Sequence, residues 1–176
     1  MFSTLNNVVA VMDMDGFMVE KRFYCKELGI LKIGNIAAQS YFFDIGLEWA
    51  DLSPKDRRTA NYVQNNIHKL PFGVLRGVKA IVLSALEEIV TGVYRVMRKD
   101  TSSAIAYKGG RYERDLLMSL GIPSLNLECF GCPKLVDLIE DMVWVETCGR
   151  HLVSDACLHC PKVEVEAFGH WLESLL

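Results

Sequence analysis

Short apolar runs at the start of the chain predict strands, and apolar spacings further along predict helices. Val8 to Met12 is a continuous apolar run, which is typical of a strand buried on both faces. Lys26 to Ile33 and Ile36 to Phe43 follow as two more strands, joined through the turn-prone pair Gly34 and Asn35. These three segments predict an antiparallel meander.

The rest of the chain alternates helices and strands. Ser53 to Asp56 supplies an N-cap, a proline at the first helical position and an acid at the third, which predicts a helix to about Lys69. Apolar residues from Leu75 to Val90 recur at helical spacing and predict a second helix that covers the sheet. Further strands are expected at 104–107 and 124–128, and helices from Arg111, at 133–141 and at 161–175. We therefore expect one α/β domain over residues 1–176, with a mixed five-stranded sheet flanked by helices.

Acidic residues follow two of the predicted strands. Asp13 and Asp15 point to the same face of the first strand, because side chains alternate along a strand. Two carboxylates so close repel unless a cation or a proton lies between them, which favours a divalent-metal site. Glu113 falls in the first turn of the helix that follows a glycine pair, where backbone or ligand can approach closely, and Asp115 is the alternative acid there.

The segment from Cys148 to Glu164 combines two kinds of metal ligand. Cys148, His151 and Cys160 offer the sulfur and imidazole ligands that zinc takes in tetrahedral sites. His159 and Glu164 offer a general base and a carboxylate, as a magnesium-dependent site needs. This segment therefore predicts a structural ion beside a catalytic one.

From spacing alone, a second zinc set is preferred. Its ligands would be Cys129, Cys132, Cys148 and His151, and Cys157 with Cys160 forms one more pair. The remaining histidines, His68 and His170, have no neighbouring ligand pattern and are expected at the surface or at helix caps.

Composition limits the kinds of binding partner and the cellular compartment that we expect for this protein. The net charge of −3 argues against general polyanion binding, so any nucleic-acid contact must be local. The candidate basic patches are Lys55, Arg57 and Arg58, and, nearer the acids, Lys108, Arg111 and Arg114. No apolar run approaches the roughly 20 residues that cross a bilayer, and no signal peptide is apparent. We expect an intracellular protein, cytoplasmic or nuclear, that has no contact with membranes and whose cysteines are ligands or buried thiols.

The order of the acidic motifs resembles that of the DEDDh, or DnaQ-like, 3′-to-5′ exonucleases, which have a ribonuclease-H-like fold. The resemblance covers nearly the whole chain. Asp15 stands where that family has Glu in Asp-x-Glu, and Glu113 and Glu164 stand where it has Asp. The resemblance implies that Asp13, Asp15, Glu113 and Glu164 hold two Mg²⁺ or Mn²⁺ ions and that His159 deprotonates the attacking water.

A zinc-bearing branch of that family is similar in a further respect. Glu27, Cys148, His151 and Cys160 look like the Glu-Cys-His-Cys set of arenavirus nucleoprotein exonuclease domains and of Maelstrom domains. The resemblance implies a structural zinc and an exonuclease that hydrolyses RNA, with single-stranded RNA as one candidate substrate. The alternative is a Maelstrom-like module that keeps the fold and the zinc without exonuclease activity, and that binds RNA or a protein partner or cuts RNA internally. The oligomeric state is not indicated.

Overall fold

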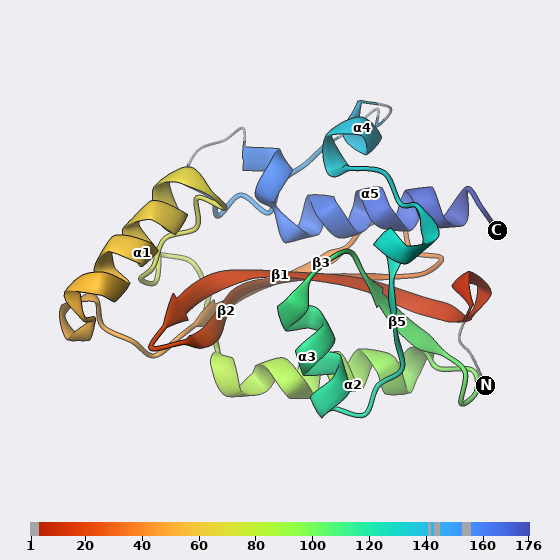
Figure 1. Ribbon diagram of the computed structural model, residues 1–176, viewed down its shortest axis with the longest axis horizontal. Coiled ribbons are helices and arrows are strands. Elements are labelled where there is room, and N and C mark those ends of the chain that lie inside the picture. The colour runs from red at the N-terminus through yellow and green to blue at the C-terminus, as the bar shows by residue number, and fades with distance from the viewer. Residues whose placement is uncertain (1–3, 141, 143–144, 153–155) are drawn as a thin grey trace.

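A six-stranded mixed sheet forms the centre of the computed structural model, which describes residues 4–140, 142, 145–152 and 156–176 (Figure 1). Its strands lie in the order β4-β3-β2-β1-β5-β6. Their bounds are β1 Val8–Val19, β2 Arg22–Lys32, β3 Gln39–Asp44, β4 Ile81–Val82, β5 Ala104–Tyr107 and β6 Ser124–Asn126. The first three form the predicted antiparallel meander, and β4, β5 and β6 join it through parallel pairs.

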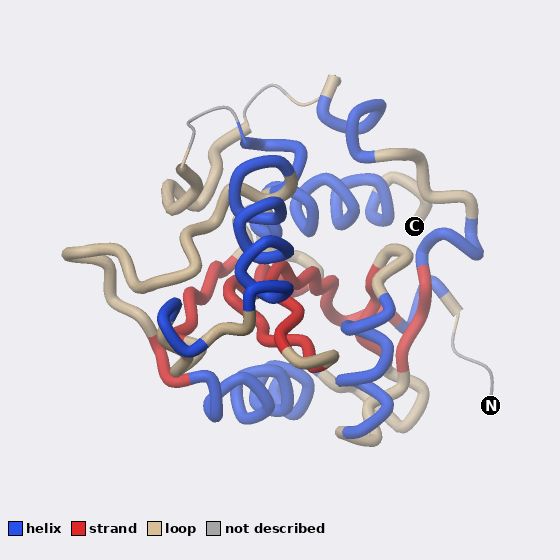
Figure 2. Tube along the Cα trace, turned by 60° about the vertical axis from the view of Figure 1, so that its left-hand side comes forward, coloured by secondary structure: helices blue, strands red, loops and turns tan. Residues whose placement is uncertain are grey.

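Helices cover both faces of this sheet (Figures 1 and 2). Their bounds are α1 Pro54–Asn66, α2 Leu86–Met97, α3 Arg111–Ser119, α4 Leu135–Ile139 and α5 Pro161–Glu173, with short 3-10 turns that include η4 Leu127–Phe130 and η5 Ala156–His159. Apolar side chains of α2 and α3 pack on one face, those of α4 and α5 pack on the other, and α1 packs near the tip of the β1–β2 hairpin. No helix in the described part of the chain is both long and apolar enough to cross a membrane.

The α/β class and the flanking helices are confirmed, but the expected five strands are wrong by one. The additional strand is Ile81–Val82, which pairs with Phe43 and Asp44 at the edge of β3. The sequence predicted helix through this stretch because its apolar residues recur at helical spacing. The unpaired edge of β3 instead takes up the backbone groups of Ile81–Val82, so the helix begins only at Leu86.

The first two strands are also longer than their apolar runs predicted. They continue to a tight turn at Glu20 and Lys21, whose φ angles of 50° and 66° match the turns that suit the twist of a hairpin. Asp13 and Asp15 therefore lie inside β1 rather than at its end. Parallel pairing with β5 ends at Val11, so both aspartates lie just beyond it, on the part of β1 paired only with β2.

Candidate functional site: an acidic cluster beside a thiolate and imidazole group

The pairing of β1 with β2 places the two aspartates beside the predicted zinc ligand of β2. Asp13 lies opposite Gly29 and Asp15 lies opposite Glu27. Residues directly opposite each other on antiparallel strands share a face of the sheet and lie side by side. The acidic cluster and the zinc set therefore meet along one pair of strands.

Gly29 lets the last helix approach this face of the sheet. A Cβ atom built on Gly29 would lie only 2.3 Å from the carbonyl oxygen of Pro161, the first residue of α5. The start of α5 consequently rests against β2 in a position that no side chain would permit. Cys160 lies just before this contact and Glu164 lies in the first helical turn after it, as predicted.

Glu113 reaches the site from α3, on the other side of β1. Its carboxylate Oε1 accepts a hydrogen bond of 2.9 Å from the backbone N–H of Met14, between the two aspartates. A Cβ atom on Gly110 would lie 1.7 Å from the second carboxylate oxygen, so glycine leaves the room that this side chain fills. Asp115, the alternative acid, is instead partly exposed and paired with Arg111 and Arg114.

The four acids Asp13, Asp15, Glu113 and Glu164 form one electrostatic cluster. Burial, followed by repulsion from Glu164, raises the pKa of both aspartates well above their ordinary range. Burial also raises the pKa of Glu113, and burial together with repulsion from Glu113 raises the pKa of Glu164 to about 8. Within the described residues, Oδ2 of Asp15 is buried without a hydrogen-bond partner. Such a group holds protons near neutral pH unless cations replace them.

His159, the predicted general base, lies apart from this cluster. Its side chain is largely exposed at the end of η5, and partial desolvation, followed by the positive charges of His151 and Lys69, lowers its pKa. The structure thus brings four of the five predicted catalytic residues together and leaves the fifth beside two cations. Closeness in sequence to Glu164 did not predict this, because His159 ends the η5 turn whereas Glu164 lies inside α5, which begins at Pro161.

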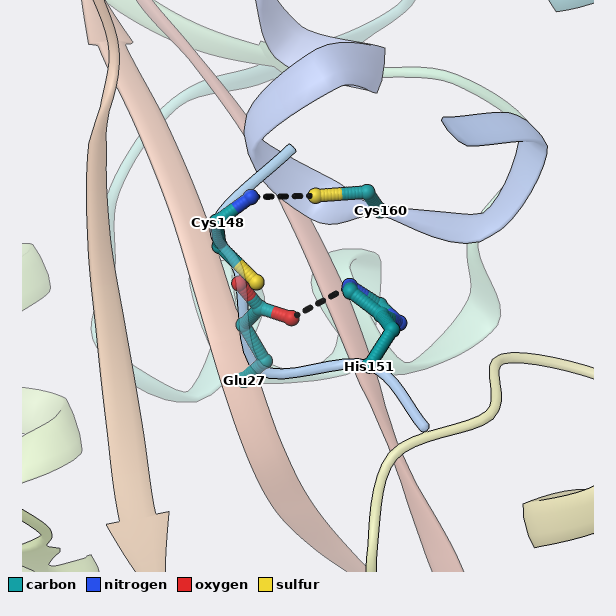
Figure 3. A group of neighbouring side chains, drawn as sticks. All are labelled: Glu27, Cys148, His151 and Cys160. Carbon is teal, nitrogen blue, oxygen red and sulfur yellow. Dashed lines mark hydrogen bonds and ion pairs between the residues drawn. The ribbon is translucent and has the colours of Figure 1, made fainter. Parts of the chain in front are cut away.

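The four predicted zinc ligands converge, as Figure 3 shows. One ligand atom from each of Glu27, Cys148, His151 and Cys160 lies within 4.8 Å of the others. Over the part of the chain that is described, this is the one group of three or more Asp, Glu, His or Cys residues arranged to hold a metal ion. The four acids Asp13, Asp15, Glu113 and Glu164 do not form such a group in the described residues.

The rival zinc set is not assembled. Cys129 is exposed on η4, whereas Cys132 lies in the apolar core beneath α5, where burial raises the pKa of its thiol to about 11. The side chain of Cys157, which belongs to the further pair, lies outside the described residues. A Glu-Cys-His-Cys group that could hold a metal ion is therefore the arrangement that the fold favours.

Two ligand atoms of this group have no hydrogen-bond partner among the described residues. Oε2 of Glu27 and Nε2 of His151 lie 3.2 Å apart, and both are buried without a hydrogen bond inside the described structure. A hydrogen bond with Cys148 lowers the pKa of Cys160 to about 5, which favours the thiolate form of its sulfur. Burial lowers the pKa of His151, but contacts with Cys160 and Glu27 outweigh it and raise that pKa to about 10. A bound cation would replace the protons that these groups share.

A second layer of hydrogen bonds orients these ligands. Ser40 donates to Oε1 of Glu27 at 2.6 Å, and Arg150 donates to the hydroxyl of Ser40 at 2.7 Å. Nδ1 of His151 bonds to the backbone carbonyl of His68, which leaves Nε2 facing the other ligands. Such contacts set the tautomer and the ring orientation of metal-binding histidines.

His68 was wrongly expected at the surface, since only 1% of it is exposed. Its Nε2 lies 3.0 Å from the carbonyl oxygen of Gly16, and its Nδ1 accepts a hydrogen bond from the backbone N–H of Leu70. The apolar neighbours Ile67 and Leu70 were a sequence signal of burial. His68 thus connects β1 to the loop whose carbonyl holds His151.

Replacement of Gly29 by alanine is expected to damage both sites at once. The new methyl group would overlap the backbone at Pro161, which cannot move as a flexible side chain can, so α5 must shift. We expect a loss of about 2–4 kcal/mol in unfolding free energy by urea denaturation, together with weaker metal retention. Gly73→Ala, which meets open space, is the control. An unchanged unfolding midpoint in Gly29→Ala would contradict the close packing.

Comparison of the sequence with protein-family models and with curated proteins finds no match. Function therefore has to be inferred from the residues and their geometry.

Proposed function

We propose that this protein is a metal-dependent 3′-to-5′ exoribonuclease of the DEDDh type, with a ribonuclease-H-like arrangement of its sheet and helices. The observation that carries the proposal is the cluster of four acids drawn from β1, α3 and α5. Their pKa values are raised by burial and, for three of them, by mutual repulsion. Perturbed carboxyl groups of this kind concentrate at functional sites, because a fold gains no stability from gathering them.

In this proposal the acids are ligands and His159 is the base. Asp13, Asp15, Glu113 and Glu164 supply the hard oxygen ligands that Mg²⁺ or Mn²⁺ prefers. Two such ions, when bound, supply positive charge that stabilises the attacking and leaving oxygens of the phosphodiester. His159 accepts a proton from the attacking water, and its lowered pKa keeps the imidazole neutral at pH 7. Because His159 is exposed, substrate binding has to draw it towards the acids.

The proposal also includes a zinc ion, with a structural role. Two sulfurs, one imidazole and one carboxylate are a ligand set that zinc accepts in tetrahedral geometry. Zinc held there would join β2, which carries Glu27, to the residue just before α5. It would thereby stabilise the placement of Glu164 against β1.

The exposed position of His159 favours one alternative function. A Maelstrom-like module would keep the fold and the zinc but bind RNA or a protein partner, or cut RNA internally. Calorimetric titration of the zinc-loaded protein with Mn²⁺ separates these functions, since a pure binding module has no tight divalent site besides zinc. Cleavage of a circular RNA would identify an endonuclease.

Hydrolysis of 3′-labelled single-stranded RNA in Mn²⁺ or Mg²⁺ tests the proposed exonuclease. We expect stepwise release of nucleotides from the 3′ end, and a loss of about 100-fold or more in rate for Asp13→Ala and for His159→Ala. Asp115→Ala removes an acid that pairs with arginines outside the cluster and should leave the rate unchanged. Full activity in both site variants would refute these roles, and DNA and duplex RNA of the same sequence would define the substrate.

A further inference from the structure

Lys108 places a positive charge beside the acidic cluster. It is the first residue after β5, the strand that flanks β1, and its side chain is half-buried. Its ammonium lies 5.6 Å from the ring centroid of Phe168 on α5. Phe168 is one helical turn after Glu164, and residues four apart share a face of a helix. The ammonium therefore lies about one turn from an acid of the proposed catalytic site.

This charge is not neutralised by another side chain of the described residues. No ion pair or hydrogen bond joins Lys108 to any described residue. Arg111 and Arg114, the other members of the predicted basic patch, are more exposed and both pair with Asp115. Of these three residues, Lys108 alone has no ion pair with a described residue, so its charge remains available to a ligand.

The charge balance of the proposed reaction calls for such a cation. Four ionised carboxylates and two divalent ions cancel, so the phosphodiester brings a net negative charge into the site. More negative charge develops on its oxygens as the water attacks. We propose that Lys108 binds the scissile phosphate through its ammonium and thereby positions RNA at the acidic cluster. This inference rests on the proposed function and adds a substrate-binding residue to it.

Lys108→Met tests the inference, because removal of this charge should change RNA binding and metal binding in opposite directions. Binding of a short single-stranded RNA, measured in Ca²⁺ to suppress hydrolysis, should weaken about 5- to 10-fold. The slope of log K against log salt should fall by about 0.7, the contribution of one phosphate contact in a single strand. Without RNA, Mn²⁺ should bind more tightly by calorimetry, because a cation that repels it is gone.

Lys99→Met is the matched control, since Lys99 is exposed near the start of the connection between α2 and β5, and it should change neither quantity. Lys108→Arg, which keeps the charge, should retain most of the RNA affinity. An unchanged salt slope in Lys108→Met, or Mn²⁺ binding that weakens together with RNA binding, would overturn the inference. Equal melting temperatures would show that neither change comes from misfolding.

The two proposals can fail separately. If wild-type protein hydrolyses RNA and Lys108→Met does so with the same kcat, salt slope and Mn²⁺ affinity, the nuclease assignment stands and the role of Lys108 is wrong. If wild-type protein binds RNA with a Lys108-dependent slope but releases no nucleotide, the exonuclease proposal fails and the phosphate contact stands. A wild-type protein that does not bind RNA would refute both.

Discussion

Replacement of Asp13 by asparagine is expected to stabilise the Mn²⁺-free protein while abolishing hydrolysis of RNA. The four charged neighbours with the largest effects on the pKa of Asp13 are all acids, so burial and repulsion together oppose its ionised form. Asparagine has nearly the same shape without the charge. We expect a gain of about 0.5–2 kcal/mol in unfolding free energy, the range usual for one stabilising substitution. The lost ligand should also weaken Mn²⁺ binding by at least 10-fold.

The stability of the wild-type protein should fall as the pH rises, because the same buried acids then become charged. The raised pKa values mean that the folded state keeps protons which the unfolded chain releases. The contribution of Glu164 to stability is therefore present below 4.5, its ordinary pKa, and is lost as the pH rises to about 8. The gain from Asp13→Asn should accordingly be small near pH 5 and largest near pH 8.5.

Urea denaturation at these two pH values, with zinc retained and no Mn²⁺ added, measures this effect. Asp115→Asn is the control, because it removes an acid that has two arginine partners and should not stabilise the protein. Added Mn²⁺ should stabilise wild-type protein more at pH 8.5 than at pH 5, and should stabilise Asp13→Asn much less. A destabilised Asp13→Asn would show that this carboxylate has a structural partner.

Loss of the zinc set is expected to have the largest effect on stability. If the group of Glu27, Cys148, His151 and Cys160 holds zinc, then Cys148→Ser removes a ligand and leaves buried polar groups unpaired. Because binding energy at a structural zinc site is folding energy, we expect a loss on the order of 5 kcal/mol. For a chain of this size that lowers the melting temperature by about 10–20 °C. Nuclease activity should fall as well, since Glu164 depends on the placement of α5.

Metal analysis and calorimetry of purified variants check this expectation. Wild-type protein should contain one zinc per chain, and Cys148→Ser should contain much less. Cys129→Ser is a matched control, because that cysteine is exposed and outside the group, and it should keep both the zinc and the melting temperature. If Cys129→Ser lost its zinc instead, the assignment of the zinc to Cys129, Cys132, Cys148 and His151 would be the correct one.

Local chemistry was enough to predict the α/β class and most of its elements from the sequence. The Ser53 cap sets the start of α1 through a contact with Asp56, and the apolar run at Val8–Met12 is recognisable as a strand because both of its faces are buried. The helical spacing from Leu75 to Val90 failed because the choice between helix and strand at Ile81–Val82 depends on the edge of β3, which is distant in sequence. Periodicity carries no information about which backbone groups a remote strand leaves unpaired.

The sequence by itself also determined which side chains could act, because acids, thiols and imidazoles have fixed chemistry wherever they lie. Only the tertiary structure decided which of them meet. The contact of Gly29 with Pro161 brings Cys160 towards Glu27 and Glu164 towards Asp13, whereas Cys132 enters the core and His159 stays exposed. Distances between ligands, and the pKa values that burial and repulsion set, arise from packing between segments far apart in the chain. For that reason spacing along the sequence favoured the set with Cys129 and Cys132, which the fold does not bring together.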